Sequence, residues 1–399
     1  MKVAIVCDWL TNVGGAEKVL LAVHRLYPRA PIYTSKYSPK GIDWFRDADV
    51  RTGWLNVFPA CMRRLLAPLR QRWFAKLDLS EYDLIISVTG AEAKGVKSGR
   101  WRAEHGLPSK NPKGIHISYC HVPTQYYWQM YETYVKDPGF KFLNPVVRFC
   151  FKMLVGPLRR GDYKAAQVPD YYVTISEYAK GLIDKYYERD SVVIHPPVET
   201  EVFKIEAEAG RIYSSEVTGL GSRLQKNICD HPSQSYYIIT SRQVNWKRID
   251  LAIGACMRLR KKLLVVGEGP EHDKLVKMAE GSELVEFVPL VGKEELAELL
   301  MGAKGYLFPS LEPFGIAPVE ALSAGCPVIA YGKGGSCDYI KDGVNGLLFE
   351  KQTVKSLAEA MGRFEKMKFD TAKVVKSAEK FSLERFNKEM KDYVNEQFK

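Results

Sequence analysis

Short apolar runs alternate with helix-length amphipathic segments along nearly the whole chain. The runs are apolar on both faces, which is typical of parallel strands covered by helices on either side. The alternation therefore predicts parallel α/β sheets. The predicted strands are residues 3–8, 83–88, 115–120, 171–175, 192–194, 236–240, 262–266, 284–287, 305–308 and 327–330.

A break in this alternation follows the fifth run. Residues 194–203 carry two prolines, and a polar, poorly periodic segment continues to about residue 235. A chain of 399 residues is too long for one ordinary core and suits two or three domains. We predict an N-terminal domain over 1–200 and a C-terminal domain over 201–380, each a doubly wound Rossmann-like sheet with ligands at the carboxyl ends of its strands.

The end of the chain has its own pattern. Leu383, Phe386, Met390 and Tyr393 recur at helical spacing, with polar residues between them. This predicts an amphipathic helix within 381–399, which packs either on its own domain or back on the first.

The net charge of +11, with a pI near 9.0, indicates an anionic partner or simply a basic surface. Nucleic acid, an anionic membrane and phosphorylated substrates are the three candidates. No apolar run approaches the roughly 20 residues that span a bilayer, and the first run is too short for a signal peptide. The eight cysteines are scattered without a CxxC pair, which favours the reducing cytoplasm over a disulfide scaffold or a metal ribbon.

Two stretches after predicted strands are suited to phosphate. In "TNVGGAEKVL" (11–20), Gly14 and Gly15 precede a helix, so they form either a tight turn or a phosphate contact. In "IITSRQVNWKRID" (238–250), Arg242 and Lys247 follow a strand. A guanidinium and an ammonium group together suit a diphosphate, although an ordinary basic loop would have the same composition.

Two further stretches also follow strands. The "GEGP" sequence at 267–270 is interpreted first as a strand-to-helix turn. In "LEPFGIAPVEA" (311–321), Glu312 lies in a loop, Gly315 begins a run of backbone N–H groups, and Glu320 lies on the following helix. A carboxylate that accepts two hydrogen bonds can bind a ribose diol or sugar hydroxyls.

These four stretches together resemble the retaining glycosyltransferases of family 4. The likeness covers nearly the whole chain and includes the E-x-F-G-x-x-x-x-E motif, "ALSAGCPVIA" and the glycine pair before Asp338, where family members usually have Glu. The resemblance implies an α/β GT-B fold, in which two doubly wound Rossmann-like domains face each other across a cleft. It also implies a hexosyltransferase.

The resemblance also implies residue roles. Arg242 and Lys247 would hold the donor diphosphate, and Glu312 would hold hydroxyls of the donor sugar. Glu320 would bind the ribose, and Gly15, beside Gly14, would meet the diphosphate from the N-terminal domain. The implied loop over the sugar and phosphate is Phe314, Gly315, Ile316 and Ala317, and the implied catalytic set is His121, Glu312, Arg242 and Lys247.

A fifth stretch, "HISYCHVPTQYYWQMYETY" (116–134), places His121 after a strand. A lone histidine is more often structural than catalytic. The stretch resembles a bacterial mannosyltransferase subgroup of O-antigen and exopolysaccharide assembly, although Gln125 and Gln129 replace the usual Arg and Asp. The resemblance implies that His121 lies against the donor sugar or the acceptor, and that Asp162 in "LRRGDYKAA" orients groups on the acceptor side.

The basic charge gathers in two segments, 53–77 and 140–160, that also carry aromatic and aliphatic residues at helical spacing. Such segments are typical of interfacial helices on anionic lipid, although core helices with basic outer faces have the same pattern. Pro59, Pro68, Pro145 and Pro157 predict that these helices are short. The predicted acceptor-side or membrane residues are Asp162, Trp54, Arg63, Arg64, Trp73, Arg159 and Arg160, and Arg70 belongs to the same basic run.

The hypothesis is a retaining glycosyltransferase on the inner face of the cytoplasmic membrane. It would move a hexose, first of all mannose from GDP-mannose, to a lipid-linked or growing glycan in cell-surface polysaccharide assembly. We expect no cofactor and no metal, because the nucleotide sugar is a co-substrate and no acidic motif suits a divalent ion. The alternatives are a UDP-sugar donor, a nucleotide-sugar epimerase, a non-catalytic scaffold and a basic nucleic-acid-binding protein, although no nucleic-acid module is recognisable.

Overall fold

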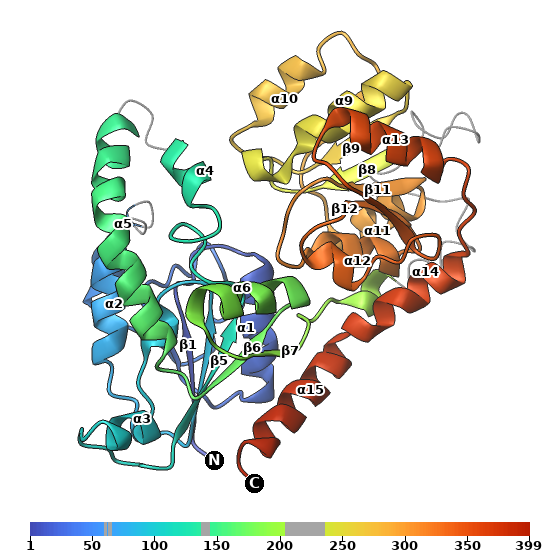
Figure 1. The fold of residues 1–399 in the computed structure, drawn as a ribbon. Helices are drawn as coiled ribbons and strands as arrows, with labels where there is room; N and C mark the ends of the chain where they lie inside the picture. Colours follow the sequence, from blue (N-terminus) through green and yellow to red (C-terminus); the bar gives the residue numbers. More distant parts are fainter. Residues whose placement is uncertain (60–61, 63–65, 137–143, 204–235) are drawn as a thin grey trace. The chain divides into compact units, whose positions relative to one another are not determined.

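The computed structural model describes residues 1–59, 62, 66–136, 144–203 and 236–399. The chain divides into two compact units (Figure 1). The first contains Met1–Pro196 and Asn387–Lys399, and the second contains Pro197–Phe386. The second division falls inside the last helix, α15 (Leu383–Glu396), so most of that helix belongs to the first unit.

The first unit contains a seven-stranded sheet in the order β3-β2-β1-β4-β5-β6-β7, and all of its strand pairs are parallel. The central strands are fully buried and rich in β-branched residues, which explains why they pack between helices. The strands are β1 (Val3–Cys7), β2 (Ile32–Thr34), β3 (Val50–Thr52), β4 (Leu84–Thr89), β5 (Ile115–Cys120), β6 (Tyr171–Thr174) and β7 (Val192–Val193).

Helices of the first unit pack through two clusters of buried side chains. Phe74 of α2 packs with Ala4, Val6 and Ile85 of the sheet, while Ala166 at the end of α5 packs with the β6 and α6 side chains. The helical elements are α1 (Gly15–Leu26), η1 (Trp54–Val57), α2 (Ala67–Lys76), η3 (Ala93–Gly95), α3 (Gly99–Glu104), α4 (Tyr131–Lys136), α5 (Asn144–Ala166) and α6 (Glu177–Tyr187).

The second unit contains a six-stranded parallel sheet in the order β10-β9-β8-β11-β12-β13. One core packs α9 and α13 on this sheet, with Ile253 and Leu357 against Val265 and Leu307 (Figure 1). The strands are β8 (Tyr237–Thr240), β9 (Leu263–Val266), β10 (Val285–Val288), β11 (Gly305–Phe308), β12 (Val328–Tyr331) and β13 (Gly346–Phe349). The helical elements are η5 (Asn245–Lys247), α9 (Ile249–Leu259), α10 (His272–Met278), α11 (Lys293–Met301), α12 (Ile316–Ser323), η6 (Gly335–Asp338), α13 (Val354–Phe364), α14 (Thr371–Ala378) and η7 (Glu379–Phe381).

Each sheet has a point where the order of strands reverses, between β1 and β4 in the first unit and between β8 and β11 in the second. Loops at the carboxyl ends of these strands diverge and leave room for a ligand. Gly14 and Gly15 lie after β1, Arg242 and Lys247 lie after β8, and Glu312 lies after β11, so the topology brings several predicted donor residues to these points.

All ten predicted strands are present, and the sequence analysis missed β2, β3 and β13. The prediction that prolines keep the segment over 140–160 in short helices is wrong, because α5 runs for 23 residues with Pro157 inside it. Pro145 lies in the first turn, where a helix needs no N–H donor. Pro157 removes the hydrogen bond to the carbonyl of Met153, and Met153 is exposed, so water can satisfy that carbonyl. Within the described residues, no helix has the length and apolar character needed to cross a membrane.

Candidate functional site

Arg242 and Lys247 lie in the loop that follows β8 in the second unit. Arg242 is exposed, and its side chain forms no hydrogen bond or ion pair with a described residue. Lys247 ends the short helix η5, and its ammonium group donates to Glu312 Oε1 at 2.5 Å. The loop after β8 therefore presents one unpaired guanidinium and one ammonium paired with a carboxylate.

Glu312 lies in the loop after β11 and is fixed from several directions. Ser310 Oγ donates to Glu312 Oε1 at 2.8 Å. The backbone N–H of Gly335, in the turn after β12, donates to the Glu312 carbonyl at 2.9 Å. The loops after β8, β11 and β12 thus meet at Glu312, because the strand order brings their carboxyl ends together.

Gly315 is the N-cap of α12 and has a φ of 89°, a left-handed conformation that favours glycine. A Cβ at this position would lie 2.5 Å from the ring of Phe308, so a side chain has no room either. Phe314 is buried, its ring packs on Tyr339 and Phe381, and its carbonyl accepts from Tyr339 Oη. This turn aims the first N–H groups of α12, including those of Ile316 and Ala317, past the end of the sheet, where an anion can bind.

Glu320 lies within α12, about one turn beyond Ile316. Burial raises the pKa of Tyr306, and the charges of Glu312 and Glu320 raise it further. The Tyr306 hydroxyl hydrogen-bonds with Thr240 at the end of β8. Both carboxylates are therefore within electrostatic reach of the same buried phenol at the carboxyl end of β8.

The first unit carries the remaining predicted donor residues. Gly14 is the N-cap of α1, and Gly15 is the first helical residue and is exposed. No Cβ covers the backbone here, and the α1 N-terminus favours an anion. The structure therefore presents these glycines as the sequence analysis expected, and the sequence-based assignment of a diphosphate contact stays a prediction.

His121 follows β5 directly, and its ring contacts Tyr119 edge to face at a centroid distance of 5.7 Å. Its Nε2 atom is buried and has no hydrogen-bond partner among the described residues. Burial lowers the pKa of His121 to about 4, and the charge of Asp8 opposes the shift. The ring is thus neutral near pH 7, so it can offer a hydrogen bond but no positive charge.

Asp8 is a site residue that the sequence analysis did not single out. Its carboxylate accepts from Thr89 Oγ1 at 2.9 and 3.0 Å, from the Gly90 N–H at 2.9 Å and from the Ala93 N–H at 2.8 Å. These bonds fix the turn after β4, beside the neighbouring strand β5, which His121 follows. The sequence did contain a signal for Asp8, because it is an acidic residue at the end of an otherwise apolar predicted strand.

Asp162, predicted on the acceptor side, is buried within the first unit. It pairs with Lys94 Nζ at 2.6 Å and accepts from Thr124 Oγ1, Trp128 Nε1 and Tyr187 Oη at 2.8, 2.7 and 2.8 Å. Only 2% of Asp162 is exposed, so it cannot bind an acceptor directly. It instead positions the segment from Thr124 to Trp128, which follows His121.

Several residues predicted to contact lipid are placed elsewhere. Arg70 is 3% exposed and binds Glu92 through two hydrogen bonds of 3.0 and 3.1 Å. The prediction that it belongs to a basic outer face is therefore wrong. Trp73 packs against the core beside Phe74 and is only partly exposed, and its contact with lipid stays a prediction. Arg159 donates to the Tyr127 carbonyl and lies over the rings of Trp128 and Tyr131, which makes it a packing residue.

Other residues of that prediction remain on the surface. Trp54 is 55% exposed, and Arg160 is exposed in the carboxyl-terminal half of α5. Arg63 and Arg64 lie outside the described residues. The amino-terminal half of α5 adds an exposed apolar stripe at helical spacing, formed by Val146, Phe149, Met153 and Leu154.

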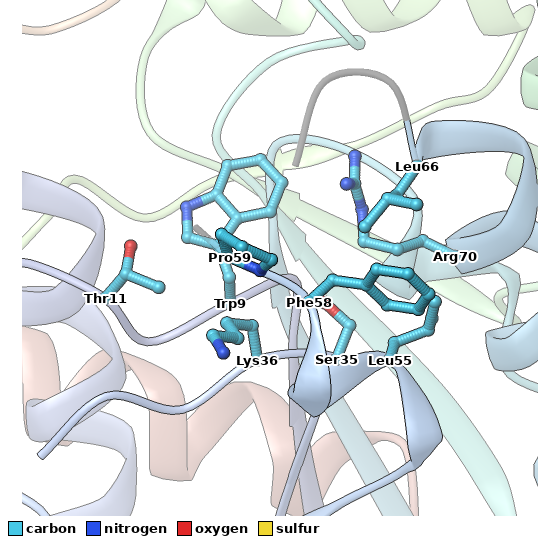
Figure 2. Close-up of a pocket in the computed structure, with 9 residues that line it drawn as sticks. All are labelled: Trp9, Thr11, Ser35, Lys36, Leu55, Phe58, Pro59, Leu66 and Arg70. Atoms are coloured by element: carbon cyan, nitrogen blue, oxygen red, sulfur yellow. The ribbon is translucent and has the colours of Figure 1, made fainter. Parts of the chain in front are cut away.

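A small pocket of the first unit lies where β1 and β2 end (Figure 2). It combines the Trp9 indole and the Lys36 side chain with an apolar wall of Leu55, Phe58 and Leu66. The Arg70 guanidinium lies 5.1 Å from the centre of the Trp9 ring. Lys36 donates to the Asn56 carbonyl and has no ion-pair partner among the described residues. The pocket thus offers an aromatic face and a cation beside an apolar surface.

In the described part of the chain, no group of three or more His, Cys, Asp or Glu side chains is placed to hold a metal ion.

Comparisons with known proteins were made at three levels. Residues 224–381 match the family model described as Glycosyl transferases group 1. The chain is 26% identical over 253 residues to the poly(glycerol-phosphate) alpha-glucosyltransferase of Bacillus subtilis, covering 59% of this chain and 37% of that protein. It is 32% identical over 188 residues to mouse alpha-1,3/1,6-mannosyltransferase ALG2, covering 40% and 45% respectively. The matches therefore span less than half the length of these two relatives.

Among solved structures, the crystal structure of Anabaena Alr3699/HepE in complex with UDP matches with a TM-score of 0.68 and 19% identity. The match covers 99% of this chain and all of that chain. It confirms the predicted fold class, with two Rossmann-like units each built on a parallel sheet.

Proposed function

We propose that this chain, whose residues 224–381 form a glycosyl transferases group 1 domain, is a retaining hexosyltransferase that uses a nucleotide-sugar donor. The observation that carries the proposal is the grouping of Lys247 and Glu312, in contact at 2.5 Å, with Arg242 on the same loop as Lys247. Glu320 completes the set on the helix that follows Glu312. Cations for a diphosphate and carboxylates for hydroxyls are thereby gathered at the carboxyl edge of one sheet.

The chemistry that we propose is mainly electrostatic. Arg242 and Lys247 neutralise the negative charge that grows on the diphosphate as the bond to the sugar breaks. Glu312 holds the sugar hydroxyls, and Glu320 holds the ribose. The departing diphosphate helps to deprotonate the acceptor hydroxyl on the same face of the sugar, which accounts for retention. Because two side-chain cations carry this role, we propose that transfer needs no divalent metal.

The first donor that we propose is GDP-mannose, and a UDP-sugar is the second. The name of ALG2 as a mannosyltransferase supports the first. The UDP complex of Alr3699/HepE supports the second, a UDP-sugar. The name of the Bacillus relative, an alpha-glucosyltransferase, likewise supports a sugar other than mannose. The GDP-mannose assignment otherwise rests on the resemblance carried by the stretch around His121.

The acceptor that we propose is a lipid-linked or growing glycan in cell-surface polysaccharide assembly. The support is the exposed stripe on α5, with Phe149 and Met153 each 65% exposed, and the 55% exposure of Trp54. An apolar stripe with cations nearby, such as Arg160, suits a peripheral position on an anionic membrane. We accordingly place the enzyme on the inner face of the cytoplasmic membrane.

A panel of nucleoside diphosphates and nucleotide sugars tests the donor. We expect GDP or UDP to raise the melting temperature, and the corresponding sugar nucleotide to be turned over in the presence of a chelator. Glu320→Ala should weaken nucleotide binding about tenfold, and Arg242→Ala should lower turnover by about 100-fold. Arg258→Ala, an exposed-face change on α9, is the matched control. Wild-type kinetics in both site variants would refute the proposal.

A further inference from the structure

The second unit has a pocket at the carboxyl ends of β9 and β10, beside the loop that carries Arg242. It encloses about 870 Å³, including the part open to solvent. Its lining is formed by the turn Gly267–Gly269, which includes Glu268, by His272 and by the segment Phe287–Pro289. The roles proposed above account for the sugar, the diphosphate and the ribose of the donor, and they leave the base without a protein partner. The inference below rests on that proposed function.

Gln243 connects the pocket to the cation loop. It directly follows Arg242, and none of its surface is exposed. Its backbone N–H donates to the Glu268 carbonyl at 2.9 Å, and its carbonyl accepts from the Glu271 N–H at 3.1 Å. Gly269 packs so closely on Gln243 that a Cβ would lie 2.4 Å from the Gln243 carbonyl oxygen. The turn from Gly267 to Glu271 is therefore fixed against the loop that carries Arg242.

The side chain of Gln243 also sets the tautomer of His272. Gln243 Nε2 donates to the Gly267 carbonyl, which can only accept. The amide oxygen must then face His272, and Gln243 Oε1 lies 2.8 Å from His272 Nδ1. Because an amide oxygen only accepts, Nδ1 carries a proton, and in the tautomer with a single ring proton Nε2 presents its lone pair.

The orientation of the His272 ring is fixed as well. The Phe287 ring meets it edge to face, with centroids 5.4 Å apart and planes at 81°. His272 Nε2 forms no hydrogen bond with any described residue, and His272 lines the pocket. The wall around it is mainly apolar, formed by Phe287, Val288 and Pro289. The pocket thus combines an apolar surface with the Glu268 carboxylate and with one hydrogen-bond acceptor of fixed orientation, His272 Nε2.

We propose that His272, held by Gln243, reads the base of the donor nucleotide through His272 Nε2. An acceptor of fixed orientation beside an apolar wall suits a flat heterocycle with a ring N–H, which uracil has at N3 and guanine at N1. The corresponding ring nitrogens of cytosine and adenine are acceptors, and two acceptors that face each other repel. The inference therefore assigns the donor to the uridine or guanosine diphosphate sugars, and it makes His272 a specificity-determining residue.

The test measures dissociation constants of UDP, GDP, N3-methyl-UDP and N1-methyl-GDP, whose methyl groups remove the ring N–H. For the wild type we expect methylation of the preferred nucleotide to weaken binding about tenfold, which is the size of one good hydrogen bond. In His272→Ala, the parent and the methylated nucleotide should bind within about twofold of each other. Gln243→Leu should show the same loss of discrimination, because it frees the His272 tautomer.

Two controls separate the possible outcomes. Lys277→Ala, an exposed change on the same helix, should keep the discrimination of the wild type. Inorganic pyrophosphate should bind His272→Ala as it binds the wild type, which also shows that the variant is folded. If His272→Ala keeps the wild-type preference for the unmethylated base, the inference is overturned while the proposed function stands. If the wild type binds no nucleotide at all, the proposed function fails and the inference fails with it.

Discussion

Lys247 Nζ lies 2.5 Å from Glu312 Oε1, so the proposed cation for the donor diphosphate is paired with the proposed carboxylate for the donor sugar. The side chains are 24% and 19% exposed, so the pair is partly shielded from water. A bound nucleotide sugar would offer each of them a new partner. We therefore expect substrate binding to exchange this ion pair for contacts with the nucleotide sugar.

Removing the carboxylate should separate binding from transfer. In Glu312→Ala, Lys247 loses its partner, so we expect GDP or UDP to bind two- to fivefold more tightly, because a partly exposed ion pair contributes little. Transfer should nevertheless fall at least 100-fold, because the sugar is no longer held. Calorimetric titration and a turnover assay measure the two effects.

A matched control is the exposed pair of Glu199 and Lys293. Glu199→Ala also frees a lysine of the second unit, and it should leave nucleotide affinity unchanged. A Glu312→Ala protein that lost nucleotide affinity together with turnover would mean that Glu312 mainly orders its loop.

The buried pair of Arg70 and Glu92 should dominate the stability of the first unit. Both side chains are less than 5% exposed, and Tyr126 Oη also donates to Glu92. Burial raises the pKa of Glu92 despite the charge of Arg70. Arg70→Ala would leave this carboxyl without its main partner, and we expect it to lower the free energy of unfolding by about 3–5 kcal/mol. Urea unfolding measures the change, and Lys388→Ala in an exposed pair of α15 should cause none that is measurable.

Asp162 should affect turnover through position. Asp162→Asn weakens the bond to Lys94 and the bonds that hold Thr124 and Trp128, so the segment after His121 loses its support. We expect turnover to fall between 10- and 100-fold, because small misplacements of reacting groups have effects of this size. The affinity for the nucleoside diphosphate, whose proposed partners lie mainly in the second unit, should stay within twofold. An equal loss of both would contradict a positioning role.

The stability of the first unit should fall in mild acid. Burial lowers the pKa of His121 to about 4 and that of His116 to about 3, against an ordinary value of 6.5. Between the lowered pKa of each ring and 6.5, the unfolded chain binds more protons than the folded one. The free energy of unfolding therefore rises with pH in this range, and stability falls as the pH drops from 6.5 towards 4. Each ring should contribute about 2 kcal/mol to the difference between pH 7 and pH 5.

The measurement compares urea unfolding at pH 7 and pH 5 for the wild type and for His121→Asn, which cannot titrate in this range. The variant should show a smaller pH dependence. An unchanged dependence would mean that His121 titrates in the folded protein as it does in the unfolded one.

The sequence predicted the central strands well because they are buried on both faces and lie between clear helical segments. It missed β2 and β3, which have three residues each, and β3 is partly exposed and carries Arg51. It also missed β13, although the Gly346–Phe349 strand is largely buried. A short run has too few positions for periodicity to distinguish a strand from a loop.

The candidate site shows a different limit. Motifs identified Lys247 and Glu312 as site residues, but their contact joins positions 65 residues apart and depends on the strand order. The same limit explains the error at Arg70, whose partner Glu92 lies 22 residues away. Helical periodicity places a charge on a face of a helix, and it cannot show that another element covers that face.

The exposed stripe of α5 provides the test of membrane association. Phe149 and Met153 lie one turn apart on the amino-terminal half of the helix, and burying one such side chain in lipid contributes about 2 kcal/mol. Phe149→Asp/Met153→Asp should therefore lower co-sedimentation with vesicles that contain anionic phosphatidylglycerol at least tenfold. Val344→Asp, at an apolar residue that is 42% exposed in the second unit, is the control and should bind as the wild type does. Turnover with a soluble acceptor should remain in the wild type, the α5 double variant and Val344→Asp. Equal vesicle binding by all three proteins would exclude α5 as the contact with lipid.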